Sequence, residues 1–146
     1  MLEDIRRLLL DAVVLEGVRQ AWLESQPGPA GGHEEGGFIV QDYDRSYAVI
    51  RWPHGTADEI LVPAHDGCEA QGKPIWLTFH THPNTGSDFM QEPSEDDEIA
   101  VRDDRDLKGR HYLGEIVIAD DLTYLISPQG QVSALGPTRV LLALIA

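Results

Sequence analysis

The sequence predicts an α+β fold of the α/β/α type, in which a central mixed β-sheet is flanked by an N-terminal helix and by a second helix in the middle of the chain. Three observations support this prediction: a long amphipathic stretch at the N-terminus, several short apolar runs bounded by turn residues, and a helix-start pattern between two of those runs. A chain of 146 residues fits one domain, 1–146. This length disfavours a (β/α)8 barrel, which usually needs about 250 residues.

Residues 2–23 are predicted to form one amphipathic helix that covers a face of the sheet. Its charged residues fall mostly on one side, and its apolar stripe is too wide for an exposed recognition helix. The helix must end before residues 26–32, because two prolines and three glycines there cannot continue it. The apolar residues at helical spacing are Ile5, Leu8, Leu9, Ala12, Leu15 and Trp22.

Most of the other predicted elements are strands. The run from Ile75 to Phe79 is apolar on both faces, which predicts a central position in the sheet. Alternating apolar residues predict the other strands, and Asp120 with Asp121 predicts a hairpin turn. A leucine-rich closing segment predicts a short helix that packs on the sheet or forms a dimer contact. The other strands are predicted at 38–40 paired with 46–52, and at 59–62, 114–119, 122–126 and 131–135, and the closing helix at 138–145.

A possible metal site follows the central strand. His80 and His82 project to the same side of an extended segment, because side chains alternate along a strand. Zinc commonly takes imidazole nitrogens and a carboxylate oxygen, and it keeps a fourth position open in catalytic sites. Asp97, near the start of the next predicted helix, is the best candidate for the third ligand.

The predicted metal-site helix spans residues 94–107. Ser94 is its expected N-cap, and the acidic residues of its first turn suit the positive end of the helix dipole. Ser94-x-x-Asp97 is also close to a capping box, so helix initiation alone explains these two residues. Capping does not explain His80 and His82, and the metal interpretation therefore depends on the combined pattern.

Three motifs together resemble the signature of the JAMM/MPN metallopeptidases, and they lie between residues 34 and 97. The resemblance implies an MPN/cytidine-deaminase-like architecture. Members of that family are zinc-dependent isopeptidases that cut after the C-terminal glycines of ubiquitin-like proteins. One departure is visible, because the segment between the second and third motifs is about four residues longer than is usual in the family. The motifs are Glu34-x-Gly-Gly, His80-x-His82-Pro83 and Ser94-x-x-Asp97.

The resemblance also implies a role for each of these side chains. One Zn2+ ion would be bound by His80, His82 and Asp97. Glu34 would accept a proton from the attacking water and deliver it to the leaving amine. Ser94 would donate a hydrogen bond to the developing oxyanion. The expected reaction is hydrolysis of a peptide or isopeptide bond, with a ubiquitin-like protein or peptide as substrate.

The other glutamate and histidine residues have no defined position in these motifs, and the sequence around them gives weaker indications of function. Glu34, rather than Glu35, fits the Glu-x-Gly-Gly spacing, although each glutamate taken alone is typical of a solvated strand entry. His33 is interpreted as a surface residue or as a support for the ligands. His54 and His65 lie in predicted loops without a partner at ligand spacing, so neither is assigned a role.

The loop from Pro83 to Pro93 contains two large apolar residues, Phe89 and Met90. Large apolar side chains are unusual in a loop. Either they face the substrate as part of a lid, or they fold back onto the core.

Composition narrows the range of partners and compartments. Twenty-five acidic and eleven basic residues give a formal net charge of −14, which disfavours nucleic acids and anionic membranes as partners and can attract a basic one. The single Cys68 excludes an internal disulfide and a cysteine-rich zinc site, and it is interpreted as an inert small side chain. The sequence has no long apolar run and no signal-peptide pattern, so a cytoplasmic protein is expected.

Two other functions are compatible with the same residues. The first is a non-catalytic MPN-like binding or scaffold module, although such domains usually lack some of the ligands that are all present here. The second is a zinc amidase that acts on a different small substrate, because fold and site chemistry do not fix the substrate.

Overall fold

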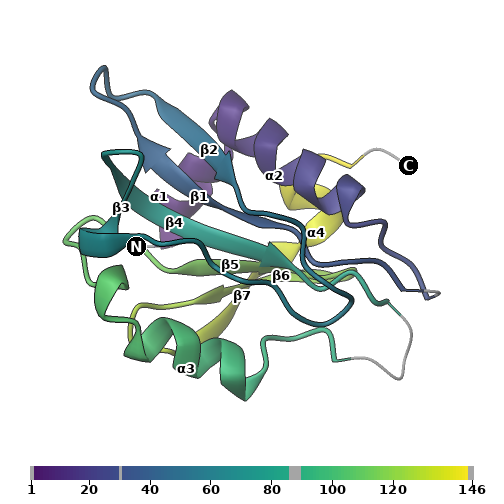
Figure 1. Ribbon diagram of the computed structural model, residues 1–146. Coiled ribbons are helices and arrows are strands. Elements are labelled where there is room, and N and C mark those ends of the chain that lie inside the picture. Colours follow the sequence, from purple (N-terminus) through teal and green to yellow (C-terminus); the bar gives the residue numbers. More distant parts are fainter. Residues whose placement is uncertain (1, 30, 86–89, 145–146) are drawn as a thin grey trace.

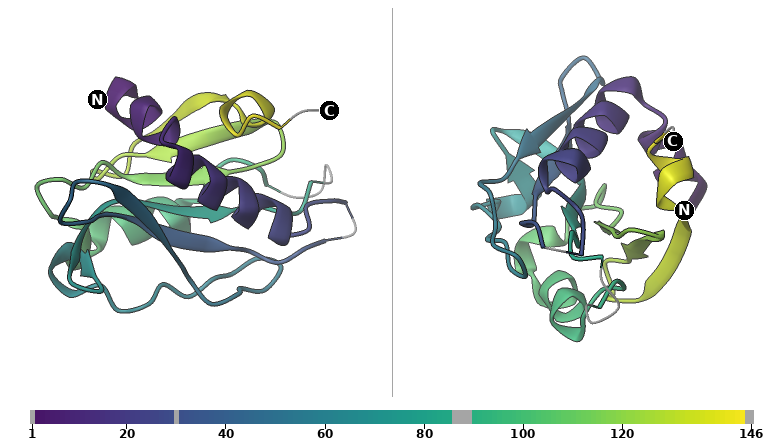
Figure 2. Two further views of the ribbon diagram at one scale, coloured as in Figure 1. Left: turned by 90° about the horizontal axis from the view of Figure 1, so that it is seen from above. Right: turned by 90° about the vertical axis from the view of Figure 1, so that its right-hand side faces the viewer.

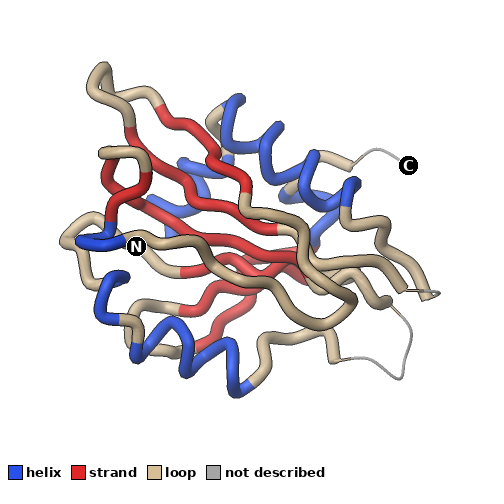
Figure 3. The backbone as a smooth tube through the Cα atoms, viewed as in Figure 1, coloured by secondary structure: helices blue, strands red, loops and turns tan. Residues whose placement is uncertain are grey.

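The computed structural model describes residues 2–29, 31–85 and 90–144. In this part of the chain seven strands form one mixed sheet with the order β2-β1-β4-β5-β6-β7, and β3 pairs with β4 outside that path. Only β4 and β5 run parallel among the paired strands, which confirms the predicted α+β class (Figures 1 and 3). The strands are β1 Gly36–Gln41, β2 Tyr47–Arg51, β3 Glu69–Ala70, β4 Lys73–Thr81, β5 Glu115–Ile118, β6 Leu122–Ile126 and β7 Val132–Pro137.

Helices cover both faces of the sheet. The helices α1 (Leu2–Leu9), α2 (Ala12–Glu24) and α4 (Thr138–Leu141) lie on one face, and α3 (Glu95–Asp103) lies on the other (Figure 2). Each face has its own apolar core, as alternation along the strands requires. One core packs α1 and α2 against residues such as Ile39. The other includes Phe38 of the same strand together with α3.

The central strand β4 has the position that its apolar sequence predicts. It pairs with β1 on one side and with β5 on the other, and Ile75, Leu77 and Phe79 are fully or almost fully buried. The register with β1 shifts between Ile39 and Val40, where the pairing skips Trp76. Beyond this irregularity, the pairing of β4 with β1 is regular up to His80, one of the predicted metal ligands.

The N-terminal prediction of a single helix is wrong, because the chain breaks between α1 and α2. The side chain of Asp11 accepts hydrogen bonds from the backbone N–H groups of Val13 and Val14 at 3.0 and 3.2 Å, which starts a new helix. Leu10 at the break is 78% exposed. Asp11 therefore acts as a cap and not as a residue of a polar helix face.

Three other predicted elements differ from the structure in extent. Residues 59–62 are not a strand but part of the loop that follows β2, and the short third strand is β3. The predicted helix 94–107 is α3 followed by a 3-10 turn, Arg105–Leu107. The closing helix is limited to α4, with residue 145 outside the described part of the chain. The remaining strands confirm the predictions within about two residues at each end.

None of the helices in the described ranges combines the length and the apolar character needed to cross a bilayer.

Candidate metal centre

The end of β4 places His80 and His82 on the α3 face of the sheet. Hydrogen bonding to β5 continues past the strand end, since the His82 N–H donates to the Ile118 carbonyl at 2.8 Å. The imidazoles therefore extend from backbone that is fixed by its neighbours. His80 is almost fully buried and His82 is partly buried.

The first turn of α3 brings Asp97 to these two histidines. The capping box predicted from sequence is present: the Asp97 N–H donates to Ser94 Oγ at 3.0 Å, and the Ser94 N–H donates to Asp97 Oδ2 at 2.9 Å. The two interpretations of Ser94-x-x-Asp97 are thus compatible, because the capping box orients the Asp97 carboxylate towards the imidazoles.

The three proposed ligands form a triangle made of two imidazoles and one carboxylate. His80 Nε2 lies 3.3 Å from His82 Nε2 and 3.6 Å from Asp97 Oδ1, whereas His82 Nε2 lies 3.3 Å from Oδ2, the other oxygen of the same carboxylate. Zinc bonds of about 2.0–2.1 Å in a tetrahedral arrangement separate ligand atoms by about 3.3–3.4 Å. The donor set and its spacing therefore fit a zinc ion with one coordination position left for water or substrate.

The other nitrogen of each imidazole is held by a group outside the triangle. His80 Nδ1 lies 2.8 Å from a carboxylate oxygen of Glu115, and His82 Nδ1 lies 2.9 Å from the carbonyl oxygen of Gln91. Both acceptors require the proton on Nδ1, which leaves Nε2 of each ring free to bind a metal. Such partners fix the tautomer and the ring orientation of metal-binding histidines.

Without a cation, charges and hydrogen bonds among these groups shift the pKa values of His80 and Asp97. Burial alone would lower the pKa of His80, but the carboxylates of Glu115 and Asp97 raise it well above its usual value. Burial alone would raise the pKa of Asp97, but hydrogen bonds from His80 and His82 hold it far below its usual range. A metal that binds here must displace the proton shared among these side chains, so its affinity will increase with pH.

Glu34 lies beside the triangle because β1 starts where β4 ends. Gly36 pairs with His80 in the antiparallel ladder, and the Thr81 N–H donates to the Glu35 carbonyl at 2.9 Å. The Glu34 backbone is held from the other side by Gly55 and Thr56 at 2.8 and 2.7 Å. The glycine after Glu35 is required by close packing, since a Cβ on Gly36 would lie 2.5 Å from the Trp52 ring.

The Glu34 carboxyl is buried in the same cavity as the proposed ligands. Burial raises its pKa to about 7, although the nearby His80 and His82 lower it in part. A carboxyl with a pKa near neutral pH can both accept and return a proton, which is the property a general base needs. A bound cation would lower this pKa, and the effect would be larger the closer the cation lies to the carboxyl.

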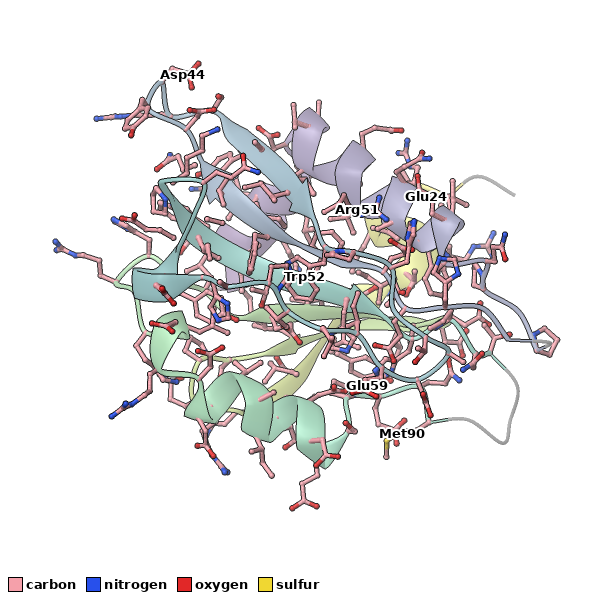
Figure 4. The ribbon with its side chains drawn as sticks, in the orientation of Figure 1. Glu24, Asp44, Arg51, Trp52, Glu59 and Met90 are labelled. Carbon is pink, nitrogen blue, oxygen red and sulfur yellow. The ribbon has the colours of Figure 1, made fainter. Side chains whose placement is uncertain are left out.

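Two hollows meet at the centre, between α3, the loop after β2 and the sheet. The larger has a volume of about 590 Å3 and the smaller about 220 Å3, and both are lined by Glu34, Asp58, Ser94 and Asp97. Figure 4 shows Glu59 and Met90 where the loop and the chain before α3 approach each other. The larger hollow is strongly acidic, with further carboxyl groups from Glu59, Asp96, Asp104 and Glu115.

Of the two large apolar residues in the loop before α3, the structure describes only Met90. Met90 is 57% exposed and lines the smaller hollow, so it does not fold back onto the core. Phe89 lies outside the described residues. Asn84 links the loop to its surroundings, because its side chain donates to the Ala57 carbonyl at 2.8 Å and accepts from the Gly32 N–H at 3.2 Å.

Sequence reasoning missed Glu115 and misjudged Glu35. Glu115 is buried at the start of β5, and an acidic residue at the head of an otherwise apolar strand was a signal that could have found it. Glu35 is not solvated but has no exposed surface, and it contacts His33 and His54 on the sheet face opposite the metal centre. Nothing in the local sequence indicates that His54 belongs to this group.

His65, which has no role assigned from sequence, lies between the loop after β2 and the end of α3. Its Nε2 lies 2.7 Å from an Asp104 carboxylate oxygen and its Nδ1 lies 2.7 Å from the Pro63 carbonyl oxygen. This pair fastens the loop after β2 to the end of α3.

No known protein family matches the sequence, and no curated protein or solved structure is significantly similar to it. The function must therefore be argued from the three motifs and from the geometry that brings them together.

Proposed function

We propose that this protein is a zinc-dependent metallopeptidase of the JAMM/MPN type. The observation that supports the proposal most directly is the convergence of two imidazole nitrogens, 3.3 Å apart, on the Asp97 carboxylate, with the Glu34 carboxyl in the same cavity. The first motif, more than forty residues before the other two, lies beside them in the fold. A capping box alone would place Asp97 but would require neither histidine.

Zinc in a site of this kind acts as a Lewis acid and makes water reactive at neutral pH. The protein's own residues hold and direct that chemistry. Glu115 and the Gln91 carbonyl orient the two imidazoles. Glu34 takes a proton from the attacking water and delivers it to the leaving nitrogen, which therefore departs as a neutral amine and not as an anion.

Ser94 is suited to stabilise the oxyanion that forms at the substrate carbonyl. Its Oγ accepts a hydrogen bond from the Asp97 N–H, so the hydroxyl hydrogen is not used by the capping box. Ser94 also lines both hollows. A hydroxyl donor fixed by a helix start loses little orientational freedom when the reaction begins, which makes it an effective donor.

The fold is compatible with an MPN/cytidine-deaminase-like architecture, which we include in the proposal. In this arrangement β4 and the residue just after it supply two ligands, the start of α3 supplies the third, and the segment just before β1 supplies the general base. The three segments meet because β1 is antiparallel to β4 and the chain crosses from β4 to α3 on one face.

The two hollows suit the two sides of a scissile amide bond. The smaller is lined in part by Ala57, Pro83 and Asn84, which suits a tail without large side chains, such as the Gly-Gly terminus of a ubiquitin-like protein. The larger, acidic hollow suits an amine-bearing leaving group such as a lysine side chain. This assignment of the hollows favours an isopeptidase over an amidase for small neutral substrates.

The test is hydrolysis of a ubiquitin-like protein joined through its Gly-Gly terminus to a lysine side chain. Activity should appear with zinc, disappear after treatment with a chelator and return when zinc is added. Zinc binding without hydrolysis of this substrate or of a small amide would support the scaffold alternative. Hydrolysis of small amides alone would support the amidase alternative.

A further inference from the structure

The two consecutive glutamates before β1 serve opposite faces of the sheet. Glu34 faces the cavity with His80, whereas the Glu35 side chain contacts residues on the α2 side. Arg51 of β2 contacts Glu35 and also pairs with Glu24 at the end of α2 at 3.0 Å, and Figure 4 shows Glu24 and Arg51 together beside that helix. The Glu35 environment is therefore separate from the proposed metal centre.

Glu35 is a fully buried carboxylate on which two imidazoles converge. Its Oε1 lies 2.5 Å from Nη2 of Arg51, and its Oε2 lies 2.6 Å from Nε2 of His33 and also contacts Nδ1 of His54. One carboxylate oxygen is thus approached by two ring nitrogens from different parts of the chain. Two histidines and one carboxylate form a recognised donor set for zinc.

A cation can reach this group from solvent. The side chain of His54 is 73% exposed and that of His33 is 31% exposed, and a hollow lined by both rings and Glu24 opens beside them. Ligand atoms around zinc are about 3.3 Å apart, so both rings must swing outward from Oε2 by less than 1 Å. Their exposure permits that movement while Glu35 stays fixed by Arg51.

A bound cation would fasten the backbone that carries Glu34. His33 and Glu35 flank Glu34, and His54 precedes Gly55, whose N–H donates to the Glu34 carbonyl at 2.8 Å. Cross-linking these side chains would join the loop after β2 to the start of β1. Glu34 would then be held from both faces of the sheet.

We propose that His33, Glu35 and His54 form a second divalent-cation site, on the α2 face of the sheet, that is independent of His80, His82 and Asp97. The alternative is a hydrogen-bonded group in which two imidazole N–H donors neutralise Glu35 without a metal. The two arrangements predict different zinc stoichiometries. They also predict different effects of replacing the histidines with Asn or Gln, whose side-chain amides keep an N–H donor but bind zinc poorly.

The experiment titrates zinc into the chelator-stripped full chain, with calorimetry and metal analysis after dialysis as readouts. The wild type should bind two zinc ions. The variant with His33→Gln and His54→Asn, which keeps an N–H donor at each position, should bind one. His82→Gln should also bind one, and combining all three substitutions should leave none. His111→Gln, an exposed histidine away from both sites, is the matched control and should bind two.

The outcomes separate the two proposals. If the wild type binds one zinc that is lost in His82→Gln but kept in the variant with His33→Gln and His54→Asn, the second site does not exist and the first stands. If the one zinc is lost only when His33 and His54 are changed, the second site stands and the proposed catalytic centre fails. Circular dichroism of each variant checks that lost binding does not reflect lost folding.

Discussion

The two faces of the sheet carry groups of nearly the same composition but of different geometry. On the α3 face, two imidazole nitrogens and a carboxylate stand 3.3–3.6 Å apart, and each ring is held through its other nitrogen. On the α2 face, two imidazoles contact a single oxygen of Glu35, while Arg51 takes the other. The first group is spaced for a cation as it stands, whereas the second must open to admit one.

This difference shows that ligand identity alone does not define a site. The α3-face group is mostly buried and opens into two hollows that Glu34, the proposed general base, also lines. The α2-face group has a buried carboxylate beside an arginine and one exposed ring, an arrangement that favours a structural role. Glu34 and Glu35 are adjacent in sequence and therefore test the contrast most directly.

The largest effect is expected from Glu34→Gln. This substitution removes the proton acceptor but leaves the three proposed ligands intact, so turnover should fall by about 10²–10⁴-fold while zinc at the α3-face site is retained. The measurement is hydrolysis of the Gly-Gly-linked substrate alongside metal analysis. Unchanged turnover would mean that Glu34 is not the general base.

Ser94→Ala should reduce kcat by about 10²–10³-fold, because one oxyanion donor is lost. It should also lower the free energy of unfolding by about 1 kcal/mol, since the α3 N-cap is removed. Ser94→Gly is the matched control, because glycine is tolerated as an N-cap but lacks the hydroxyl. If Ser94→Gly keeps full turnover, the hydroxyl acts only in capping.

Glu35→Gln should lower the free energy of unfolding, whereas Glu34→Gln should lower turnover. Removing the buried charge takes away one of the two carboxylates that pair with Arg51, so the free energy of unfolding should fall by about 3 kcal/mol. Urea unfolding of the metal-free protein measures this change. Arg51→Lys, which keeps the charge but loses the planar contact, should cost less. A loss below about 1 kcal/mol would contradict the stabilising role assigned to the pair.

Without metal, the ionisation of Glu34 should make stability depend on pH. Its folded pKa of about 7 exceeds the ordinary 4.5, so the folded state binds more protons between these values and stability falls as pH rises through them. The loss should approach about 3 kcal/mol above pH 7. Glu34→Gln should remove this part of the pH dependence, as urea unfolding in a chelator at pH 5 and pH 8 will show.

Much of the fold and of the α3-face group could be predicted from local patterns. The apolar run of β4, the His-x-His alternation and the Ser94 cap are each encoded within a few residues, because strand and helix periodicity are local properties. The break at Asp11 was missed because a capping aspartate and a surface aspartate look alike in a helical pattern.

The α2-face group and the support from Glu115 could not be found in this way. His54 meets Glu35 only because the loop after β2 returns to the start of β1, which local sequence does not reveal. Glu115 reaches His80 only because β5 runs parallel to β4 in that register.

The sequence by itself determined which side chains are available and which of them share a strand face or a helix turn. The tertiary structure decided which of them meet, and on which side of the sheet each consecutive glutamate acts. The physical reason is that alternation along a strand is fixed by backbone geometry, whereas the pairing of β1 with β4, and the path of the loop after β2, depend on how distant segments bury their apolar surfaces together.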